Sequence, residues 1–374
     1  QDRSSAASDV YKRQNIFNYP FTYESKLNLK IGDFVEVPFG KSKKIGVVWD
    51  YFENDNNKNY KTKKIIRKLE IPQLKKKTLD FLNWFSEYNI VPKGMALKLA
   101  LLSGKPVAIL DKKFYDEFSF KLNKNSFQLN SEQKKSLAEI NDMNKKFNVH
   151  VLQGTTGSGK TIVYFEALKH ILQKGYQGLI MLPEIGLTNQ FEKKFFEFFG
   201  FKAAIWHSGI TKKNKEIIWS GITNGEISVV IGARSSLFLP FKNLGLIIVD
   251  EEHDQSYKQD EGIIFNARDM AISRASFENI PINLITSVPS IETYENIKKK
   301  KYTCSKLVRR YQNASLPKYE IINLNNVKMD KQSWLSKEII QKVNFHLNKN
   351  DQVLFFLNRR GFSPSVLCKK CFNN

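Results

Sequence analysis

A glycine-rich segment has the residue types and spacing of a phosphate-binding loop. The pattern G-x-x-x-x-G-K-[ST] is met by Gly154-Thr155-Thr156-Gly157-Ser158-Gly159-Lys160-Thr161. Glycines let backbone N–H groups approach phosphate oxygens at the start of a helix. Lys160 would reach the β and γ phosphates, and the Thr161 hydroxyl would join Mg²⁺. We therefore predict that this loop binds ATP together with Mg²⁺.

An acidic segment further along the chain supplies groups that phosphoryl transfer needs. The apolar run Leu246-Ile247-Ile248-Val249 ends in Asp250-Glu251-Glu252-His253. Asp250 would hold the hydrated Mg²⁺, and Glu251 would polarise the attacking water. Acids at a strand end can instead cap a helix, but their pairing with a phosphate-binding loop favours the catalytic interpretation. We predict Lys160, Asp250 and Glu251 as the catalytic residues.

A glutamine upstream of the glycine-rich loop has two possible roles. It lies in Leu129-Asn130-Ser131-Glu132-Gln133. The Gln133 carboxamide offers the donor and the acceptor that recognition of adenine requires. The same residue in an Asn-Ser-Glu-Gln helix start is also what a capping box contains. Both interpretations stay open at the level of sequence.

Two cysteines near the end of the sequence have metal-ligand spacing. They form Cys368-Lys369-Lys370-Cys371, which in a reducing compartment indicates half of a zinc site. A structural zinc ion takes four ligands, so this pair cannot close a site alone. Cys304 is distant in sequence and is expected to be a buried core thiol. Zn²⁺ is therefore expected only in a complete protein that supplies further ligands.

Short apolar runs alternate with helical segments after about residue 127, and each run ends in Gly, Pro or acidic residues. The runs are Val149–Leu152, Gly178–Leu182, Ser228–Ile231, Leu246–Val249 and Ile282–Ile285. This pattern is typical of a parallel sheet that is buried on both faces, and it predicts an α/β fold. A last run, Val353–Leu357, would begin another sheet.

The remaining segments divide the chain into further parts. Residues 1–14 are small and polar without periodicity, and we interpret them as a translated linker outside the fold. Short alternations follow, which predict a small β-rich domain with C-terminal helices over 15–103. A polar linker is expected over 104–126, the ATP-binding lobe over 127–300, and the start of a second lobe over 301–374.

Composition limits the class of protein. The chain has 374 residues, enough for two or three domains, and a formal net charge of +22, which suits a polyanionic partner such as nucleic acid. A general excess of solvated Lys would give the same charge, so charge alone does not decide the partner. The sequence has no apolar stretch of about eighteen residues. We therefore expect a cytoplasmic protein that makes no membrane contact.

Longer segments between these motifs resemble a single family. They are Leu182–Thr188, Trp206–Gly209, Ile231–Phe238, Asp250–Gln259 and Phe356–Phe362. In this order they are similar to segments of PriA, the family of bacterial replication-restart helicases in superfamily 2, and the resemblance runs from about Ile16 to Cys371. It implies RecA-like lobes and an ATP-dependent 3′-to-5′ DNA helicase that recognises stalled or abandoned forks. It also implies a role in primosome assembly and replication restart.

The resemblance assigns DNA contacts to the lobe that contains the phosphate-binding loop. The residues expected to touch the backbone of a tracked single strand are Gly186, Thr188, Arg234 and Ser235. His253, close to Glu251, would couple the nucleotide state to that strand. The segment Ser256–Arg268 corresponds to an aromatic-rich loop, in which Tyr257 and Phe265 would stack on bases.

The β-rich domain resembles the family's module for a free 3′ end of DNA. Phe21, Thr22, Gly40 and Lys63 match its pocket positions. They would provide an aromatic face, polar groups for a terminal hydroxyl and a cation for phosphate. Alternatively, Phe21 and Gly40 serve only as core and turn. The implied partners are forked and single-stranded DNA, single-strand DNA-binding protein, other primosome proteins and the replicative helicase, and the chain is expected to be a monomer.

The sequence departs from the family pattern in several places, among them Ile263-Ile264, which stand where the aromatic-rich loop usually has a basic residue. Few residues stand where a winged-helix domain is usual, so that domain is expected to be absent. The motif that links hydrolysis to movement reads Thr286-Ser287-Val288, in which Val288 lacks a hydroxyl. The arginine finger of the second lobe and the other zinc cysteines are missing, so this fragment is expected to bind ATP and DNA without full activity.

Two rival functions stay open. One is another superfamily 2 translocase that moves on duplex DNA, which would show no preference for a 3′ end. The other is a fork-binding protein that has lost motor coupling through the altered Thr286-Ser287-Val288 motif.

Overall fold

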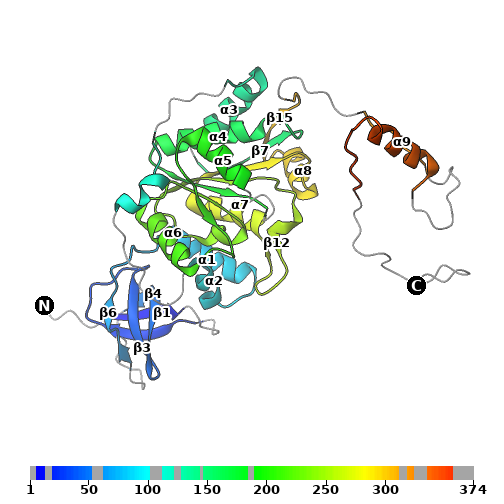
Figure 1. Ribbon diagram of the computed structural model, residues 1–374. Helices are drawn as coiled ribbons and strands as arrows, with labels where there is room; N and C mark the ends of the chain where they lie inside the picture. The colour runs from blue at the N-terminus through cyan, green and yellow to red at the C-terminus, as the bar shows by residue number, and fades with distance from the viewer. Residues whose placement is uncertain are drawn as a thin grey trace, which may run out of the picture. The chain divides into compact units, whose positions relative to one another are not determined.

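The computed structural model describes residues 6–12, 19–52, 62–101, 112–121, 128–143, 146–183, 189–310, 318–323 and 335–356. These residues fall into two compact units, Gln1–Ala314 and Ser315–Asn374. The described residues of the first unit contain two large sheets, a two-stranded antiparallel sheet of β12 (Lys258–Gln259) and β13 (Phe265–Asn266), and helices that pack on them (Figure 1).

The first sheet has six strands among the described residues, in the order β5-β2-β1-β4-β3-β6. Its strands are β1 (Ala6–Lys12), β2 (Phe21–Ser25), β3 (Phe34–Phe39), β4 (Ser42–Phe52), β5 (Lys63–Lys64) and β6 (Arg67–Lys68). One apolar cluster on this sheet gathers Tyr23, Val35, Val37, Val48 and Ile65. Val35 and Val37 lie two residues apart and are buried in the same cluster, as expected for one face of a strand. The predicted β-rich domain is thus present.

Strand β1 departs from the expectation that residues 1–14 lie outside the fold. It pairs antiparallel with β2 on one side and with β4 on the other. Without a strand there, β2 and β4 would each expose a row of unpaired backbone groups. Pairing of this kind uses the backbone, so a segment without a marked apolar pattern can satisfy it. The origin of residues 1–14 as a linker stays a prediction.

Two helices connect the first sheet to the rest of the unit. They are α1 (Lys76–Tyr88) and α2 (Lys93–Ala100). The ring centroids of Phe81 and Phe85 on α1 lie 6.0 and 5.0 Å from that of Phe238 in the second part of the unit. The indole N–H of Trp219 donates a hydrogen bond of 2.9 Å to the Ala100 carbonyl. The β-rich domain and the lobe that follows therefore share one continuous core.

The second large sheet has seven strands in the described part of the chain, in the order β15-β7-β14-β11-β8-β10-β9. Every pairing in it is parallel. Its strands are β7 (Asn148–Gly154), β8 (Gln177–Met181), β9 (Ala204–Trp206), β10 (Val229–Gly232), β11 (Leu244–Val249), β14 (Pro281–Thr286) and β15 (Thr303–Leu307). The predicted α/β fold with a parallel sheet is confirmed.

Helices cover both faces of this sheet. They are α3 (Ser131–Met143), α4 (Lys160–Gln173), α5 (Asn189–Phe199), α6 (Lys212–Asn224), α7 (Ala267–Glu278) and α8 (Ile291–Lys298). Successive residues of one strand enter different cores: Ile248 packs with α4 and α5, whereas Ile247 and Val249 pack with α6 and α7. This alternation explains why the strands read as continuous apolar runs in the sequence.

The stretch expected to be a polar linker is packed against the lobe in its described part. It contains the 3₁₀ helix η1 (Lys112–Phe118), and the side chain of Tyr115 is buried. The Tyr115 hydroxyl donates to the Ile217 carbonyl at 3.1 Å, and the Ser228 N–H donates to the Phe118 carbonyl at 3.1 Å. The buried ring and these two hydrogen bonds fix the described part of this segment to the lobe.

A buried arginine fixes the segment that follows β10. Arg274 on α7 is fully buried, and its Nη1 and Nη2 donate to the carbonyls of Leu237 and Leu239, the latter at 2.7 Å. Glu278 lies 3.9 Å from Nη2. Burial lowers the pKa of Arg274 to about 10, so the guanidinium stays charged at neutral pH. It thereby holds the 3₁₀ helix η3 (Arg234–Phe238), which carries two predicted DNA contacts.

A buried histidine on β7 predicts a pH-dependent stability. The Thr303 hydroxyl donates to the Val149 carbonyl at 3.3 Å, so Nδ1 of His150 donates to Thr303 Oγ1 at 2.8 Å. This leaves Nε2 buried without a partner among the described residues. Burial lowers the pKa of His150 to about 4, whereas an unfolded histidine has a pKa of about 6.5. The unfolded state therefore takes up a proton first as the pH falls.

We expect the unfolding free energy to fall between pH 6.5 and pH 4, by about 2 kcal/mol at pH 5 from this histidine alone. His150→Gln removes the titrating group and should lose that share of the pH dependence. Urea unfolding of both proteins at pH 7 and pH 5 measures it. Equal losses in the two proteins would show that His150 is protonated as easily in the folded state as in the unfolded state.

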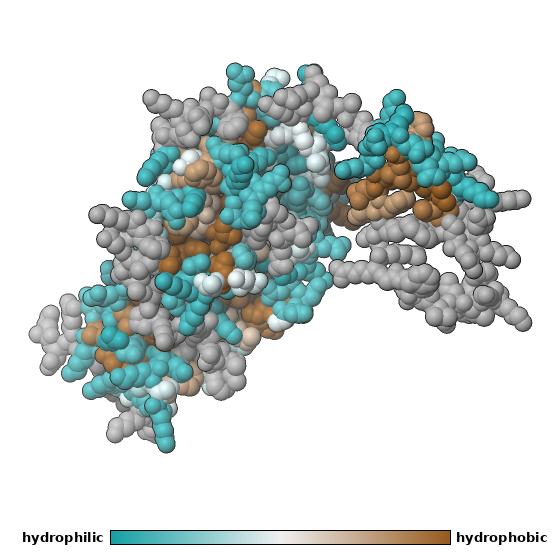
Figure 2. Space-filling model, in the orientation of Figure 1, coloured by the Kyte–Doolittle hydropathy of each residue, from teal (hydrophilic) through white to brown (hydrophobic). Residues whose placement is uncertain are grey.

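The second unit is described over residues 318–323 and 335–356. Ser336 caps the N-terminus of its helix α9 (Lys337–Leu347), because the Ser336 hydroxyl accepts from the Ile339 N–H at 3.2 Å. Ile340, Phe345 and Leu347 on this helix are exposed. Figure 2 shows both brown and teal surface in the region of α9. The described residues of the last apolar run, 353–356, form no strand, because an apolar run also needs a partner strand to pair with. The second lobe stays a prediction.

Within the described segments, no helix combines the length and apolar character that crossing a bilayer requires.

Candidate functional site

The glycine-rich loop joins the end of β7 to the start of α4. Gly157 and Gly159 adopt φ values of +81° and +82°, in the left-handed region that favours glycine. A Cβ atom on Gly159 would lie 2.3 Å from Nε2 of Gln133, so this position also requires a residue without a side chain. A Cβ atom on Gly157 would meet no atom within 4 Å. The loop is therefore shaped by its glycines and open at Gly157.

Lys160 and Ser158 turn polar groups toward the loop interior. The Lys160 side chain is 9% exposed, and its Nζ donates to the carbonyls of Gly154 at 2.7 Å and Thr155 at 3.5 Å. Ser158 Oγ is buried and has no partner among the described residues. A buried cation beside an unpaired hydroxyl is an arrangement that a bound phosphate would complete.

Asp250 stands at the end of β11, beside the same loop. The Tyr164 hydroxyl donates to its Oδ2 at 2.9 Å, and the Glu251 N–H donates to its Oδ1 at 3.0 Å. Burial raises the pKa of Asp250 to about 6, and the charge of Glu251 adds to the rise, while the Tyr164 hydrogen bond opposes it. Glu251 itself has φ +46°, an uncommon value for a residue with a side chain.

The three groups predicted to hold magnesium and nucleotide thus meet at one edge of the parallel sheet. Lys160 and Thr161 come from the start of α4, and Asp250 follows β11. The glycine cradle and the unpaired Ser158 hydroxyl fit a nucleotide phosphate, and Asp250 with Thr161 fits the oxygen ligands that Mg²⁺ prefers. Bound Mg²⁺ would neutralise charge on the phosphoryl oxygens. Lys160 would orient those oxygens from the protein side.

Gln133 caps α3 and contacts the glycine-rich loop. Its Oε1 accepts from the Asn130 N–H at 3.0 Å, while Asn130 Oδ1 accepts from the Gln133 N–H at 2.9 Å. Its Nε2 donates to the Ser158 carbonyl at 3.1 Å. The side chain is 1% exposed. The capping interpretation therefore describes these contacts, and the reading of adenine by Gln133 stays a prediction.

His253 joins the acidic motif to the end of β14. The Thr286 hydroxyl donates to the Val288 carbonyl at 2.8 Å, so Nδ1 of His253 donates to Thr286 Oγ1, also at 2.8 Å. Val288 is 67% exposed and takes part through its backbone. The hydroxyl that Val288 lacks is therefore not needed for this connection.

Glu252 is a functional candidate that the sequence did not single out. Its carboxylate is buried and accepts from the Ser290 N–H at 2.7 Å, the Ser290 hydroxyl at 3.1 Å and the Thr293 hydroxyl at 3.0 Å. Arg268 donates to it at 3.2 Å. It thus ties the acidic motif to the N-terminus of α8, where a negative charge is favourable. Ser290 with Thr293 three residues later was the sequence signal for this helix start.

The predicted strand-contact residues are only partly within the described chain. Arg234 and Ser235 lie together on η3, where Ser235 is exposed and Arg234 Nη1 donates to the Lys258 carbonyl at 2.9 Å. Gly186 and Thr188 lie outside the described residues. The arrangement leaves the Ser235 hydroxyl accessible to a phosphodiester backbone.

The two aromatics expected to stack on bases are buried. Tyr257 is 1% exposed, and its hydroxyl donates to the carbonyls of Met181 at 3.0 Å and Asp250 at 2.6 Å. Phe265 is 5% exposed and lies between Phe85 and Phe238, with ring centroids 5.4 and 5.5 Å away. In this structure both rings therefore belong to the core, where Tyr257 positions the backbone of Asp250. Stacking of either ring on a base stays a prediction, and it would require the loop to open.

A hollow of about 510 Å³ lies in the β-rich domain. All four residues predicted for a 3′-end pocket line it, namely Phe21, Thr22, Gly40 and Lys63. The Phe21 ring lies edge-on to that of Phe39, with centroids 5.5 Å apart. Gly40 has φ +58°, and a Cβ placed there would meet no atom within 4 Å. Phe21 and Gly40 therefore serve the turn and the sheet while also facing a shared opening.

The predicted zinc ligands Cys368 and Cys371 lie outside the described residues. Cys304 lies on β15 and is half-buried against the core as a free thiol.

Comparison with known proteins identifies the family. The chain is 43% identical over 359 residues to the replication restart protein PriA of Rickettsia conorii, covering 95% of this chain and 54% of that protein. This chain belongs to the PriA family. The PriA of Haemophilus influenzae is 36% identical over 312 residues, covering 79% of this chain and 42% of that protein. The chain thus spans about half the length of the PriA proteins that it matches.

Two family models match separate parts of the chain. The 3′DNA-binding domain of PriA matches residues 11–102, and the DEAD/DEAH box helicase family matches residues 130–296. The first match contains the hollow with Phe21 and Lys63, and the second contains Lys160 and Asp250. Among solved structures, RecG bound to a three-way DNA junction has 21% identity and a TM-score of 0.39, covering 64% of this chain and 30% of RecG.

Proposed function

We propose that this chain is the ATP-binding and DNA-end-binding part of a 3′-to-5′ DNA helicase that recognises stalled or abandoned replication forks. The complete protein would use ATP and Mg²⁺, carry Zn²⁺, and promote primosome assembly and replication restart in the cytoplasm. Its partners would be forked and single-stranded DNA, single-strand DNA-binding protein, primosome proteins and the replicative helicase. Family membership and the two matched domains support this proposal.

One observation carries the proposal further than family membership. Four residues that are separated in sequence, Phe21, Thr22, Gly40 and Lys63, line one opening. An aromatic face, a hydroxyl and an ammonium group are what a terminal nucleoside with its phosphate would require. Because α1 and α2 join this domain to the lobe through a common core, an end bound there would have a fixed relation to the nucleotide loop.

The contacts around the acidic motif favour a motor over a fork-binding protein that has lost its coupling. His253 bonds to Thr286, and Glu252 bonds to Ser290 and Thr293, so both connections from the acidic motif to the β14–α8 segment are formed. A change in the position of Asp250 or Glu251 on hydrolysis would therefore be transmitted to that segment.

Equilibrium binding tests the end-recognition part of this proposal. The probe is a fork with a leading strand that ends at the junction in a 3′ hydroxyl or in a 3′ phosphate. We expect Phe21→Ala to weaken binding of the hydroxyl form by about tenfold, because stacking on one base is lost. Lys63→Gln should weaken both forms, because a phosphate contact is lost.

The matched control is Lys26→Gln, which removes an exposed charge of the same domain outside the hollow. It should change both affinities less than twofold by our account. If Phe21→Ala bound both forms as tightly as the unaltered chain, the hollow would not be an end-binding pocket.

A further inference from the structure

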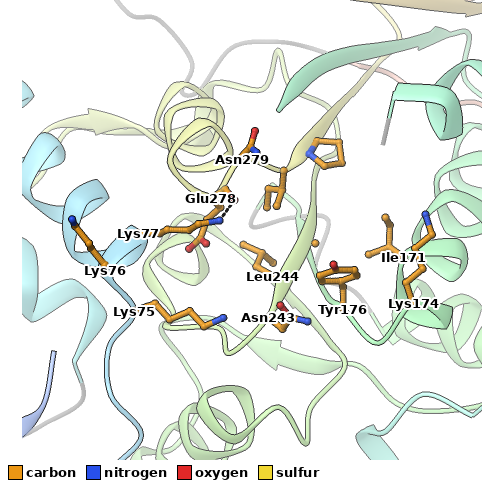
Figure 3. Close-up of a pocket in the computed structure, with 13 residues that line it drawn as sticks. Lys75, Lys76, Lys77, Ile171, Lys174, Tyr176, Asn243, Leu244, Glu278 and Asn279 are labelled. Atoms are coloured by element: carbon orange, nitrogen blue, oxygen red, sulfur yellow. Dashed lines mark hydrogen bonds between the residues drawn. The ribbon is translucent and has the colours of Figure 1, made fainter. Parts of the chain in front are cut away.

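A second hollow, of about 600 Å³, lies at the opposite edge of the parallel sheet from the nucleotide loop. Its lining includes the starts of β11 and β14, at Leu244 and Pro281, and Tyr176 just before β8 (Figure 3). Since the strands are parallel, these starts stand at the far edge from Gly154 and Asp250. The volume is within the range of roughly 300–1,000 Å³ that small-ligand sites have. Neither the phosphate-binding loop nor the 3′-end pocket uses it.

Lysines surround this hollow on two sides. Lys75, Lys76 and Lys77 stand at the start of α1, and Lys174 follows the end of α4. Within the described part of the chain, no carboxylate lies within 4.0 Å of the Nζ atoms of Lys75, Lys76 or Lys174. Figure 3 shows Lys75 directed toward Asn243, whereas Lys76 points away. The hollow therefore carries positive charge that no described carboxylate balances at short range.

The acidic residue that lines the hollow does not balance these charges. Glu278 is buried, lies 3.9 Å from Arg274 and accepts from the Thr78 hydroxyl at 3.5 Å. Lys77 donates to the Glu278 backbone carbonyl at 2.7 Å, which fixes α1 against α7. The carboxylate thus belongs to the structural contact between these helices, and the other lysines stay available.

An aromatic ring completes the lining. Tyr176 is 41% exposed, and a Cβ on Gly245 would lie 2.5 Å from its Cβ, so Tyr176 packs directly over the backbone of β11. The neighbouring apolar residues Leu244 and Ile280 are buried, which leaves the tyrosine as the main aromatic surface of the hollow. A half-exposed ring between ammonium groups matches the way that single strands are held, by stacking and by phosphate contacts.

We propose that this hollow is a second DNA contact site, at which Lys75 and Lys174 bind phosphates of a single strand and Tyr176 stacks on a base. Lys75–Lys77 lie within the match to the 3′DNA-binding domain, residues 11–102, so one wall of the hollow belongs to a DNA-binding domain. Lysine ammonium groups are compact charges that bind phosphates, and such contacts do not depend on the base sequence. An acidic peptide would also need an apolar anchor pocket, which the buried Leu244 and Ile280 do not offer. The inference rests on the proposed function only in taking DNA as the ligand.

The test measures binding of a fluorescent circular single strand, which has no 3′ end and so bypasses the end pocket. For Lys75→Gln/Lys174→Gln we expect the Kd to rise about tenfold. The slope of log Kd against log salt should fall by about 1.4, because each of the two lost phosphate contacts contributes about 0.7 to that slope. The control, Lys134→Gln/Lys135→Gln, removes two exposed charges of α3 and should change the Kd less than twofold. Both pairs are on the surface, and equal melting temperatures would show that folding is intact.

A photoreactive benzoylphenylalanine in place of Tyr176 gives a second readout, and it should crosslink to the circular strand. The inference is overturned if the Lys75/Lys174 variant binds like the Lys134/Lys135 variant with the same salt slope. It is also overturned if an oligo-aspartate peptide prevents the crosslink at lower concentration than an unlabelled oligonucleotide of equal charge. If the unaltered chain binds neither the circle nor a fork, both this inference and the proposed function are contradicted. If it binds both DNAs, the Lys75/Lys174 comparison tests this site alone.

Discussion

Lys160→Ala, placed in the complete reading frame that contains this sequence, is expected to lower DNA-stimulated ATP hydrolysis by at least about 100-fold. Its Nζ donates to the carbonyls of Gly154 and Thr155, so the ammonium group lies within the loop that would bind the β and γ phosphates. Alanine removes the charge that would orient those oxygens. Steady-state hydrolysis with saturating forked DNA measures the loss.

DNA affinity should change little in the same variant, because Lys160 is buried in the nucleotide loop. Lys169→Ala is the matched control on the same helix, α4, where Lys169 pairs with Glu166 at 3.8 Å. It should keep hydrolysis within about twofold, since a partly exposed ion pair contributes little. Hydrolysis by Lys160→Ala within threefold of the unaltered protein would show that residues 154–161 are not the catalytic nucleotide loop.

Glu252→Ala is expected to lower the unfolding free energy by about 3 kcal/mol. The substitution leaves the buried Arg268 guanidinium with Asp269 as its nearest remaining carboxylate and removes the acceptor from Ser290 and Thr293. Loss of the carboxylate also loosens the start of α8 from the acidic motif. Urea unfolding at neutral pH measures the change.

Glu292→Ala provides the comparison. Glu292 lies 3.8 Å from the same Arg268 but is exposed, so its removal should cost less than about 0.5 kcal/mol. Glu252→Gln keeps an acceptor for Ser290 and should fold well enough for hydrolysis to be measured. A Glu252→Ala protein as stable as Glu292→Ala would mean that the Arg268–Glu252–Ser290 contacts do not stabilise the lobe.

The parts that were predicted well from sequence are those in which the chemistry is local. The phosphate-binding loop needs consecutive glycines followed by Lys160 and Thr161, and the sheet needs short apolar runs that end in Gly, Pro or acids. Such patterns carry their own geometry. The convergence of Phe21, Thr22, Gly40 and Lys63 was available through family resemblance, since nothing in their spacing brings them together.

The parts that were missed depend on tertiary partners. Tyr257 and Phe265 look like stacking aromatics in a polar loop, but Met181, Phe85 and Phe238 on other elements bury them. Ile263, Ile264 and Phe265 are all apolar in the sequence, so the alternation of buried, exposed and buried side chains is visible only in the structure. Stacking on those two rings would require the loop to open.

Glu252 and Gln133 illustrate the same limit for polar residues. Glu252 is next to Glu251 in sequence, yet the Glu251 carboxylate is partly exposed and lies 3.7 Å from Nδ1 of His253, whereas that of Glu252 is buried and accepts from Ser290. Gln133 fits both a capping box and an adenine reader, and the sequence does not show that its side chain contacts Asn130 and Ser158. A residue type states which bonds are possible, and the fold selects among them.

The most direct test of the proposed function is ATP hydrolysis by the complete protein on forks whose leading strand ends in a free or a blocked 3′ end. We predict that the free end stimulates hydrolysis more than the blocked end, and that Phe21→Ala removes the difference while Lys160→Ala removes hydrolysis itself. Equal stimulation by both forks would contradict recognition of the 3′ end. Tight fork binding without any stimulation would contradict the motor.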